Sequence, residues 1–206
     1  MFLPKSPKII KALYSQLTWE IPNTENKIYL TFDDGPTPEV TDWTLDVLKQ
    51  FNIKATFFCL GQNVEKHPKL YQRILDEGHA VGNHSYSHLS GWKTSNTDYF
   101  TDIEESQKLT NSKLFRPPYG RITKSQAKHL KEQYNIIMWT VLSGDFDLKT
   151  APKKCLDNVL KNTESGAIIV FHDSKKAEPK FKYALPKAIE NLLEKGFVFE
   201  VLGEKY

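Results

Sequence analysis

The feature that most constrains the fold is an alternation of short β-rich runs with amphipathic stretches of helical spacing. This alternation is typical of βα units around a parallel sheet. The predicted strands are residues 28–32, 55–60, 80–83, 113–116, 136–141, 167–171 and 197–201. The predicted helices are residues 8–17, 39–52, 68–77, 98–109, 124–133, 152–161 and 185–195. We expect a distorted, seven-stranded (β/α) barrel of TIM type, although an open doubly wound sheet shows the same alternation.

Length and charge limit the domain organisation and the partners. The chain has 206 residues, enough for one compact domain and too few for two. We therefore expect one catalytic-type domain over residues 28–206, with residues 1–27 as an N-terminal extension packed on it. A net charge of +3, without a block of Lys or Arg, argues against a nucleic-acid partner. No stretch approaches the roughly 20 apolar residues of a membrane span. We also expect the protein to be a monomer.

The N-terminal sequence and the cysteines bear on the compartment. Lys5, Lys8 and Lys11 interrupt the apolar residues, so no secretory signal peptide is predicted. We therefore expect a cytoplasmic protein, with export by another route left open. Cys59 and Cys155 lack nearby partner cysteines, and we expect two buried free thiols, which fits a reducing compartment.

Polar clusters follow the carboxyl ends of five predicted strands. In a parallel βα barrel, active sites are built at this face of the sheet. Convergence of five clusters on one rim is a stronger signal than any single motif. The clusters are Asp33-Asp34-Gly35-Pro36, His84-Ser85-Tyr86-Ser87-His88, Arg116-Pro117-Pro118-Tyr119-Gly120, Ser143-Gly144-Asp145-Phe146 and His172-Asp173.

Two of these clusters contain residues suited to binding a metal ion. His84 and His88 are four positions apart, a spacing that lets two imidazoles chelate one cation but is common by chance. The adjacent carboxylates of Asp33 and Asp34 repel each other unless a positive group lies beside them, although Asp-Gly-Pro is also ordinary turn chemistry. One Asp with two His forms a two-His-one-carboxylate set, which leaves coordination positions open for water and substrate. The other Asp is then free to act as a base.

Four motifs in this order resemble the polysaccharide deacetylases, the NodB-homology enzymes of carbohydrate esterase family 4. The motifs are Thr31-Phe32-Asp33-Asp34-Gly35-Pro36, His84-Ser85-Tyr86-Ser87-His88, Arg116-Pro117-Pro118-Tyr119-Gly120 and Ile169-Val170-Phe171-His172-Asp173. The resemblance extends from about residue 28 to residue 201. It implies a distorted (β/α) barrel, which agrees with the strand count.

The resemblance also implies roles for individual residues. Asp33 would be the general base, and Arg116 would orient it. Asp34, His84 and His88 would bind one divalent metal ion, with zinc as the first expectation and cobalt or nickel as substitutes. His172 would be the general acid, paired with Asp145. The backbone N–H of Tyr119 would hold the oxyanion, and the side chains of Tyr119, Phe146 and Trp92 are candidates for substrate binding.

The fourth motif departs from the family pattern. Relatives often carry Asp-x-x-Asp-Trp at this point, whereas this chain has Leu142 in place of the first Asp and Phe146 in place of the Trp. The substrate of a relative therefore does not transfer directly. The expected activity is removal of N-acetyl groups from the amino sugars of a peptidoglycan or chitin-type glycan. Hydrolysis of an O-acetyl ester of the acetylxylan type, hydrolysis of a small amide, and a sugar-binding domain without catalysis are the alternatives.

Overall fold

The strands form a curled half-barrel. The computed structural model describes residues 2–203, and all named strand pairs in its sheet are parallel. The strand order is β5-β4-β3-β2-β1-β7-β6, with β8 paired to the amino-terminal part of β1. The strands are β1 (Lys27–Asp33), β2 (Thr56–Cys59), β3 (Ala80–Asn83), β4 (Leu114–Phe115), β5 (Asn135–Ile136), β6 (Val141–Leu142), β7 (Ile168–His172) and β8 (Val198–Glu200).

The strand order distinguishes a barrel from a doubly wound sheet. Strands β1 to β5 follow one another around the sheet, and β7 returns to pair with β1, as in a closed barrel. The ring is interrupted between β5 and β6, which do not pair. This arrangement confirms the predicted distorted barrel. The predicted strand over residues 136–141 is in fact two short strands, because the chain crosses the interruption there and pairs with a different neighbour on each side.

The N-terminal segment lies along this interruption. The Thr18 N–H donates to the Ile136 carbonyl, and the Met138 N–H donates back to Thr18. Further along, the Ser6 N–H donates to the Thr140 carbonyl. Buried side chains of this segment are Leu17, Trp19 and Ile21. Backbone groups left unpaired by the missing β5–β6 contact are thereby satisfied.

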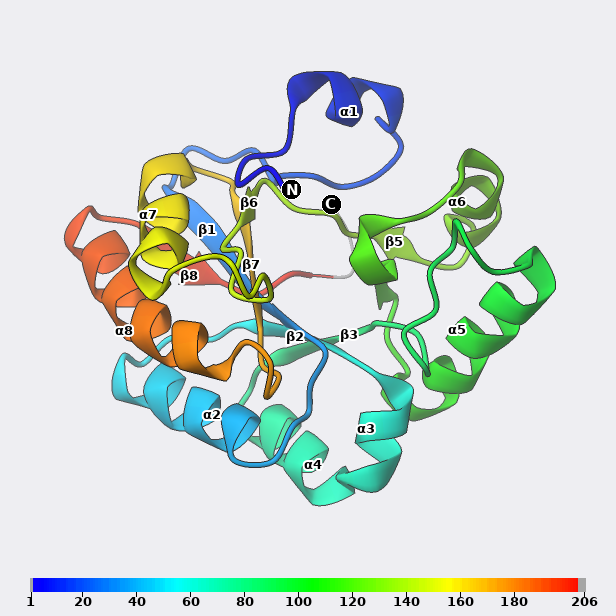
Figure 1. Cartoon of the computed structure of the whole chain (residues 1–206), viewed down its shortest axis with the longest axis horizontal. Coiled ribbons are helices and arrows are strands. Elements are labelled where there is room, and N and C mark those ends of the chain that lie inside the picture. The colour runs from blue at the N-terminus through cyan, green and yellow to red at the C-terminus, as the bar shows by residue number, and fades with distance from the viewer. Residues whose placement is uncertain (1, 204–206) are drawn as a thin grey trace.

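Helices cover the outside of the sheet (Figure 1). Their bounds are α1 (Lys8–Leu13), α2 (Val40–Gln50), α3 (Gly61–Lys66), α4 (Pro68–Asp76), α5 (Asn96–Thr110), α6 (Lys124–Leu130), α7 (Pro152–Asn162) and α8 (Glu178–Glu194). Helices α2, α4, α7 and α8 pack on one half of the barrel, and α5 and α6 pack on the other. None of the helices in the described part of the chain is long and apolar enough to cross a membrane.

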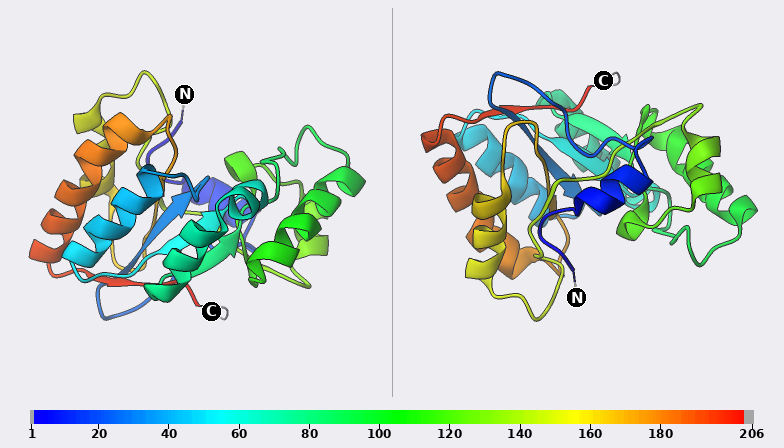
Figure 2. Two further views of the ribbon diagram at one scale, coloured as in Figure 1. Left: turned by 90° about the horizontal axis from the view of Figure 1, so that it is seen from below. Right: turned by 90° about the horizontal axis from the view of Figure 1, so that it is seen from above.

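Helices α1, α3 and α8 differ most from the prediction. Helix α1 is shorter than predicted and buries none of its side chains; it lies outside the ring of helices and faces the viewer in the right panel of Figure 2. Contacts of the N-terminal extension therefore come from its flanking residues and not from a helical face. Helix α3 was not predicted, because six residues are too few to show a helical period. Helix α8 begins at Glu178, seven residues early, and continues through Pro186.

Side chains of β1 alternate between two faces, so that one set packs in the hydrophobic core and the other points into the barrel toward the site. Ile28, Leu30 and Phe32 point to the helices and belong to the main hydrophobic cluster. The intervening residues point into the barrel, since side chains of a strand alternate between its faces. Among them, the Thr31 hydroxyl and the Asp33 carboxylate both accept hydrogen bonds from Arg116. The barrel interior is thus apolar toward the amino-terminal ends of the strands and charged at their carboxyl ends.

Candidate active site and metal centre

The five polar clusters meet at one rim of the barrel. Asp33 ends β1, and His172 ends β7 as its direct neighbour in the register. His84 follows β3 directly, and Arg116 follows β4. Asp145 lies three residues after β6. Because parallel strands present their carboxyl ends to one edge, residues distant in sequence are brought into one site.

Asp34, His84 and His88 form a compact group of potential metal ligands. One ligand atom from each residue lies within 4.8 Å of the others. The Asp34 Oδ1 atom is 3.3 Å from Nε2 of His88 and 3.8 Å from Nε2 of His84. Asp34 Oδ1 is also buried without a hydrogen-bond partner. A buried carboxylate oxygen facing two imidazole nitrogens is the arrangement expected of a cation site.

The surroundings of both histidines are compatible with binding a metal ion. Nδ1 of His84 lies 2.8 Å from the Arg116 carbonyl oxygen, so this nitrogen carries the proton and donates it. The other ring nitrogen of His84, Nε2, faces Asp34 and is the atom that would bind a metal ion. Burial and the nearby His84 lower the pKa of His88 to about 4, which keeps its ring neutral at physiological pH.

Two of the candidate ligands, and the residue after His84, have unusual backbone conformations. Asp34, Ser85 and His88 have φ values of 82°, 66° and 65°, in the left-handed region that non-glycine residues rarely adopt. Side chains fix these turns: the Asn63 amide donates to the Asp34 carbonyl, and the Ser85 hydroxyl accepts from the His88 N–H. Such conformations persist only where the surroundings determine them, as at functional sites.

Asp33 forms a buried ion pair with Arg116. The guanidinium donates to Asp33 Oδ1 at 2.6 Å and to the Thr31 hydroxyl at 2.7 Å. Its remaining donors reach two backbone carbonyls, and its plane lies 4.0 Å from the centre of the Phe58 ring. Burial alone raises the pKa of Asp33, but the charge of Arg116, with the nearby His84 and His172, reverses the effect and leaves this pKa below its ordinary value.

His172 forms a second buried pair with Asp145. The two Asp145 oxygens accept from Nδ1 and from the backbone N–H of His172, both at 2.8 Å. Burial alone lowers the pKa of the imidazole, yet the Asp145 charge and hydrogen bond raise the pKa of His172 to about 9. His172 is consequently a cation at neutral pH. The rim thus holds an ionised carboxylate at Asp33 and a protonated imidazole at His172 on neighbouring strands.

Three further predicted site residues lie around this rim. The Phe146 ring is 5.1 Å from the His172 ring and 5.2 Å from the Phe2 ring. The Tyr119 ring is 4.4 Å from the His88 ring. Trp92 has no ring contact with these metal-ligand candidates; its indole N–H donates to the Ile122 carbonyl. Leu142, the departure from the family pattern, is a buried residue of β6.

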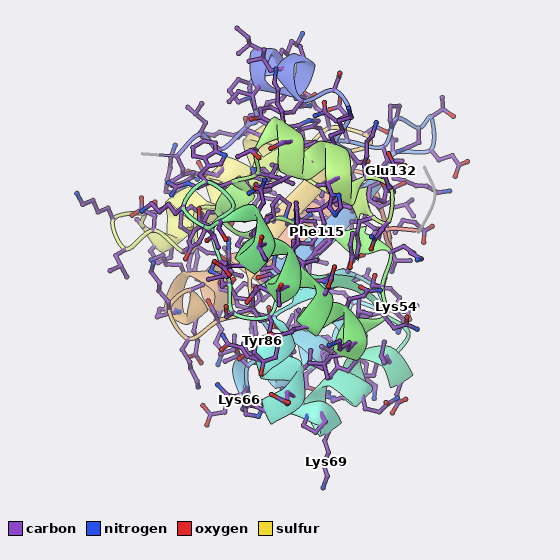
Figure 3. All side chains as sticks on the ribbon, turned by 90° about the vertical axis from the view of Figure 1, so that its right-hand side faces the viewer. Lys54, Lys66, Lys69, Tyr86, Phe115 and Glu132 are labelled. Carbon is purple, nitrogen blue, oxygen red and sulfur yellow. The ribbon has the colours of Figure 1, made fainter. Side chains whose placement is uncertain are left out.

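Sequence reasoning missed Asp102, which supports the loop between the two histidines. Its carboxylate accepts from the N–H groups of Tyr86 and Ser87 and from the Ser87 hydroxyl. In Figure 3, which looks onto the side of α5, Tyr86 lies beside this helix. A signal was present, because Asp102 shares the buried face of α5 with Tyr99, Ile103 and Ser106. A carboxylate on such a face requires a polar partner.

Sequence reasoning named Asp173 in the His172-Asp173 cluster but assigned it no role, and the structure places its carboxylate against the loop that follows Asp33 and Asp34. It accepts from the Gly35 N–H at 3.1 Å and from the Thr41 hydroxyl at 2.5 Å. A side chain at Gly35 would lie 2.1 Å from the Asp173 carboxylate, so only glycine fits there. Burial raises the pKa of Asp173 to about 8. The role of Asp173 in supporting the loop after Asp34 follows from its contacts in the fold and could not be read from the sequence motif.

Sequence comparison relates this chain to known deacetylases. The sequence profile of the family described as polysaccharide deacetylase matches residues 20–135. A peptidoglycan-N-acetylglucosamine deacetylase of Bacillus cereus is 35% identical over 195 residues, covering 91% of this chain and 92% of that protein. The peptidoglycan-N-acetylmuramic acid deacetylase PdaA of Bacillus subtilis is 33% identical, covering 88% of this chain and 72% of that protein.

Solved structures share the fold over most of the chain. A peptidoglycan N-acetylglucosamine deacetylase, solved in complex with a substituted benzamide, superposes with a TM-score of 0.87 at 36% identity. The alignment covers 96% of this chain and 95% of that one. A pseudoenzyme of carbohydrate esterase family 4 from Bacillus anthracis also superposes, with a TM-score of 0.77 at 27% identity, over 89% of this chain and 66% of that one. The fold alone therefore does not decide between an active and an inactive member.

Proposed function

The chain belongs to the polysaccharide deacetylase family, and we propose that it is a metal-dependent hydrolase that removes N-acetyl groups from amino sugars of a poly- or oligosaccharide. Peptidoglycan is the favoured substrate class, because relatives that cover most of this chain are named for it. One observation carries the proposal: Asp34, His84 and His88 converge beside an ionised carboxylate at Asp33 and a protonated imidazole at His172.

The Asp34, His84 and His88 group fits a divalent cation. The unpartnered Asp34 oxygen lacks the positive partner that a buried carboxylate needs, and both imidazoles can present a lone pair. Two nitrogen ligands and one oxygen ligand suit zinc, with cobalt or nickel as substitutes. When bound, such an ion polarises a carbonyl and lowers the pKa of water.

Asp33 is the proposed general base. Its lowered pKa keeps it ionised at neutral pH, and one of its oxygens is occupied by Arg116. The other oxygen, Oδ2, faces the metal-ligand group, 4.0 Å from Nε2 of His84. This oxygen is therefore available to accept a proton from a water molecule that attacks the acetamide carbonyl. Arg116 fixes the carboxylate and acts as a positioning residue.

His172 is the proposed general acid. An amine is a poor leaving group unless it is protonated, so cleavage of the amide needs a proton donor near the nitrogen. Because Nδ1 of His172 is bound to Asp145, its Nε2–H is the donor that remains for the substrate. The strand register places His172 next to Asp33, which allows the two to act on opposite sides of one amide group.

Tyr119 and Phe146 are proposed to contact the acyl group. The backbone N–H of Tyr119 would donate to the oxyanion that forms at the carbonyl oxygen. The Phe146 ring, beside His172, would provide an apolar surface for the acetyl methyl group. An O-acetyl ester could occupy the same position, so a substrate panel is needed to separate the amide from the ester.

Replacing the base tests the mechanism. Asp33→Asn should abolish acetate release from N-acetylated glycans, because the amide cannot accept the proton. Metal content, measured by elemental analysis, should stay near one ion per chain, since Asp33 is not among the proposed ligands. Retained turnover in this variant would overturn the base assignment. Asp34→Asn is the contrasting variant, in which metal content itself should fall.

A further inference from the structure

Two large aromatic side chains are exposed: Tyr119, which contacts His88, and Trp92, which follows His88 by four residues. Trp92 and Tyr119 have 61% and 60% of their surface exposed. The Tyr119 ring packs on His88, so this exposed surface begins directly at the site. Exposed aromatic rings that lie close to one another mark a binding surface more often than chance.

An arginine, Arg121, lies near both of these rings. The Arg121 guanidinium carbon is 5.5 Å from the centre of the Trp92 ring and 5.7 Å from that of the Tyr119 ring. Both distances are within the range of a cation–π contact. Over residues 2–203, no carboxylate forms a salt bridge with Arg121. The guanidinium is thus held by ring faces, with its in-plane N–H donors left to bind an anion.

A buried framework fixes the position of this group. The Trp92 indole N–H donates to the Ile122 carbonyl at 3.2 Å. Gln126, only 1% exposed, donates to the Gly91 carbonyl and accepts from the Thr123 N–H. A Cβ at Gly91 would lie 2.6 Å from the Arg121 carbonyl oxygen, so the two loops are in close contact. These hydrogen bonds and close contacts therefore hold the loops that carry Trp92 and Arg121 in a fixed relative position.

We propose that Arg121, which lies against the rings of Trp92 and Tyr119, is a carboxylate-binding position of the substrate groove and selects N-acetylated glycans that carry a carboxylate near the reacting sugar over neutral ones. The two rings offer apolar faces to sugar rings, and the planar guanidinium offers paired donors to a carboxylate. Tyr119 links this position to His88, which places the bound carboxylate within one or two sugars of the acetamido group. The inference rests on the proposed function and names its substrate class more narrowly.

Peptidoglycan offers such carboxylates from two sources. Muramic acid carries a lactyl carboxylate, which is free when the stem peptide has been removed. When the stem peptide is present, the lactyl group is an amide, and the carboxylates belong to the peptide. Chitin-type oligomers carry neither. A guanidinium that binds carboxylates would therefore distinguish peptidoglycan strands from chitin-type chains of the same backbone.

The test compares kcat/KM for acetate release on four substrates: N-acetylglucosamine oligomers, peptide-free peptidoglycan strands, the same strands with the lactyl group converted to a methylamide, and strands that retain stem peptides. The ratio of kcat/KM for a carboxylate-bearing strand to that for the neutral oligomer should fall about tenfold in Arg121→Gln, the loss expected for one charge-assisted pair. Lys128→Gln removes the same charge from an exposed position of α6 and should leave the ratio unchanged. Arg121→Lys should recover part of the ratio.

The outcomes are separable. A loss confined to peptide-free strands, absent on the methylamide, identifies the lactyl carboxylate, and a loss confined to peptide-bearing strands identifies the peptide. An unchanged ratio in Arg121→Gln on both overturns the proposal. If the wild-type protein releases no acetate from any substrate, the proposed function fails instead. Calorimetric binding of the strands to metal-free protein then still tests Arg121, because the variant should bind peptidoglycan strands about tenfold more weakly.

Discussion

The three buried carboxyl groups near the rim have different hydrogen-bond partners, and these partners help to determine their chemical properties. Asp33 lies against Arg116 and keeps a lowered pKa, whereas Asp173 has no cationic hydrogen-bond partner and its pKa is raised to about 8. Asp145 receives two hydrogen bonds from His172. The motifs identified Asp33 and Asp145 but could not reveal the role of Asp173, since that role depends on its contact with Gly35, in the loop that follows β1.

The Asp145–His172 pair predicts a specific pH dependence. Because the pKa of His172 is raised to about 9, kcat/KM should fall on the alkaline side only as the pH passes this value and the acid loses its proton. Asp145→Asn removes the charge that raises this pKa, so the alkaline limb should move to lower pH by at least about one unit. The measurement is the pH profile of kcat/KM.

Asp147→Asn is the matched control, because Asp147 lies two residues away and interacts with Lys149 and Thr150 instead of the site. Its alkaline limb should coincide with that of the wild type. An alkaline limb that stays in place in Asp145→Asn would remove His172 from the role of general acid.

At the scale of helices and strands, the local sequence pattern predicts most elements, whereas elements that depend on long-range pairing are not predicted. The alternation of runs was sufficient to predict most strands and helices, because each buries one face with a regular period. The split of residues 136–141 into β5 and β6 was not predictable, since it depends on which strands lie on each side of the interruption. The short α3, which begins where the Gly61 N–H donates to the Ser85 carbonyl, is likewise fixed by a tertiary contact.

Helix α5 is predicted to support metal binding through Asp102. Asp102→Ala removes the acceptor for Tyr86, Ser87 and the Ser87 hydroxyl, so the loop between His84 and His88 should loosen. Loss of such an outer contact typically weakens metal binding by about 10- to 100-fold. Competition with a chelator measures the change in zinc affinity. Glu104→Ala, at an exposed position of the same helix, should have no effect; equal affinities in the two variants would contradict this role.

At the scale of the whole molecule, the N-terminal segment, which precedes the barrel strands, covers the gap between β5 and β6. The N-terminal segment hydrogen-bonds across the interruption between β5 and β6, and the Thr140 hydroxyl donates to the Trp19 carbonyl. The sequence predicted an N-terminal extension that packs on the domain and contains a helix over residues 8–17, but α1 leaves Ile9 71% exposed. Burial lies instead in the short extended stretch that contains Trp19, which has too few residues to show a period.

This segment is therefore predicted to contribute to global stability. Trp19 is 8% exposed and belongs to the hydrophobic cluster under α5 and α6, so Trp19→Ala should lower the free energy of unfolding by about 3 kcal/mol. Ile9→Gln, on the exposed helix, should change it by no more than about 0.5 kcal/mol. Denaturant unfolding measures both. A small and equal effect of the two substitutions would show that the extension is not part of the cooperative fold.

The most direct test of the account is acetate release from N-acetylated peptidoglycan strands by wild-type protein before and after removal of its metal. The convergence of Asp34, His84 and His88 predicts that a chelator abolishes release and that one equivalent of zinc restores it. Undiminished release from protein shown to be metal-free by elemental analysis would contradict the metal-dependent mechanism. Absence of release with zinc, cobalt and nickel would contradict the assignment as an active deacetylase.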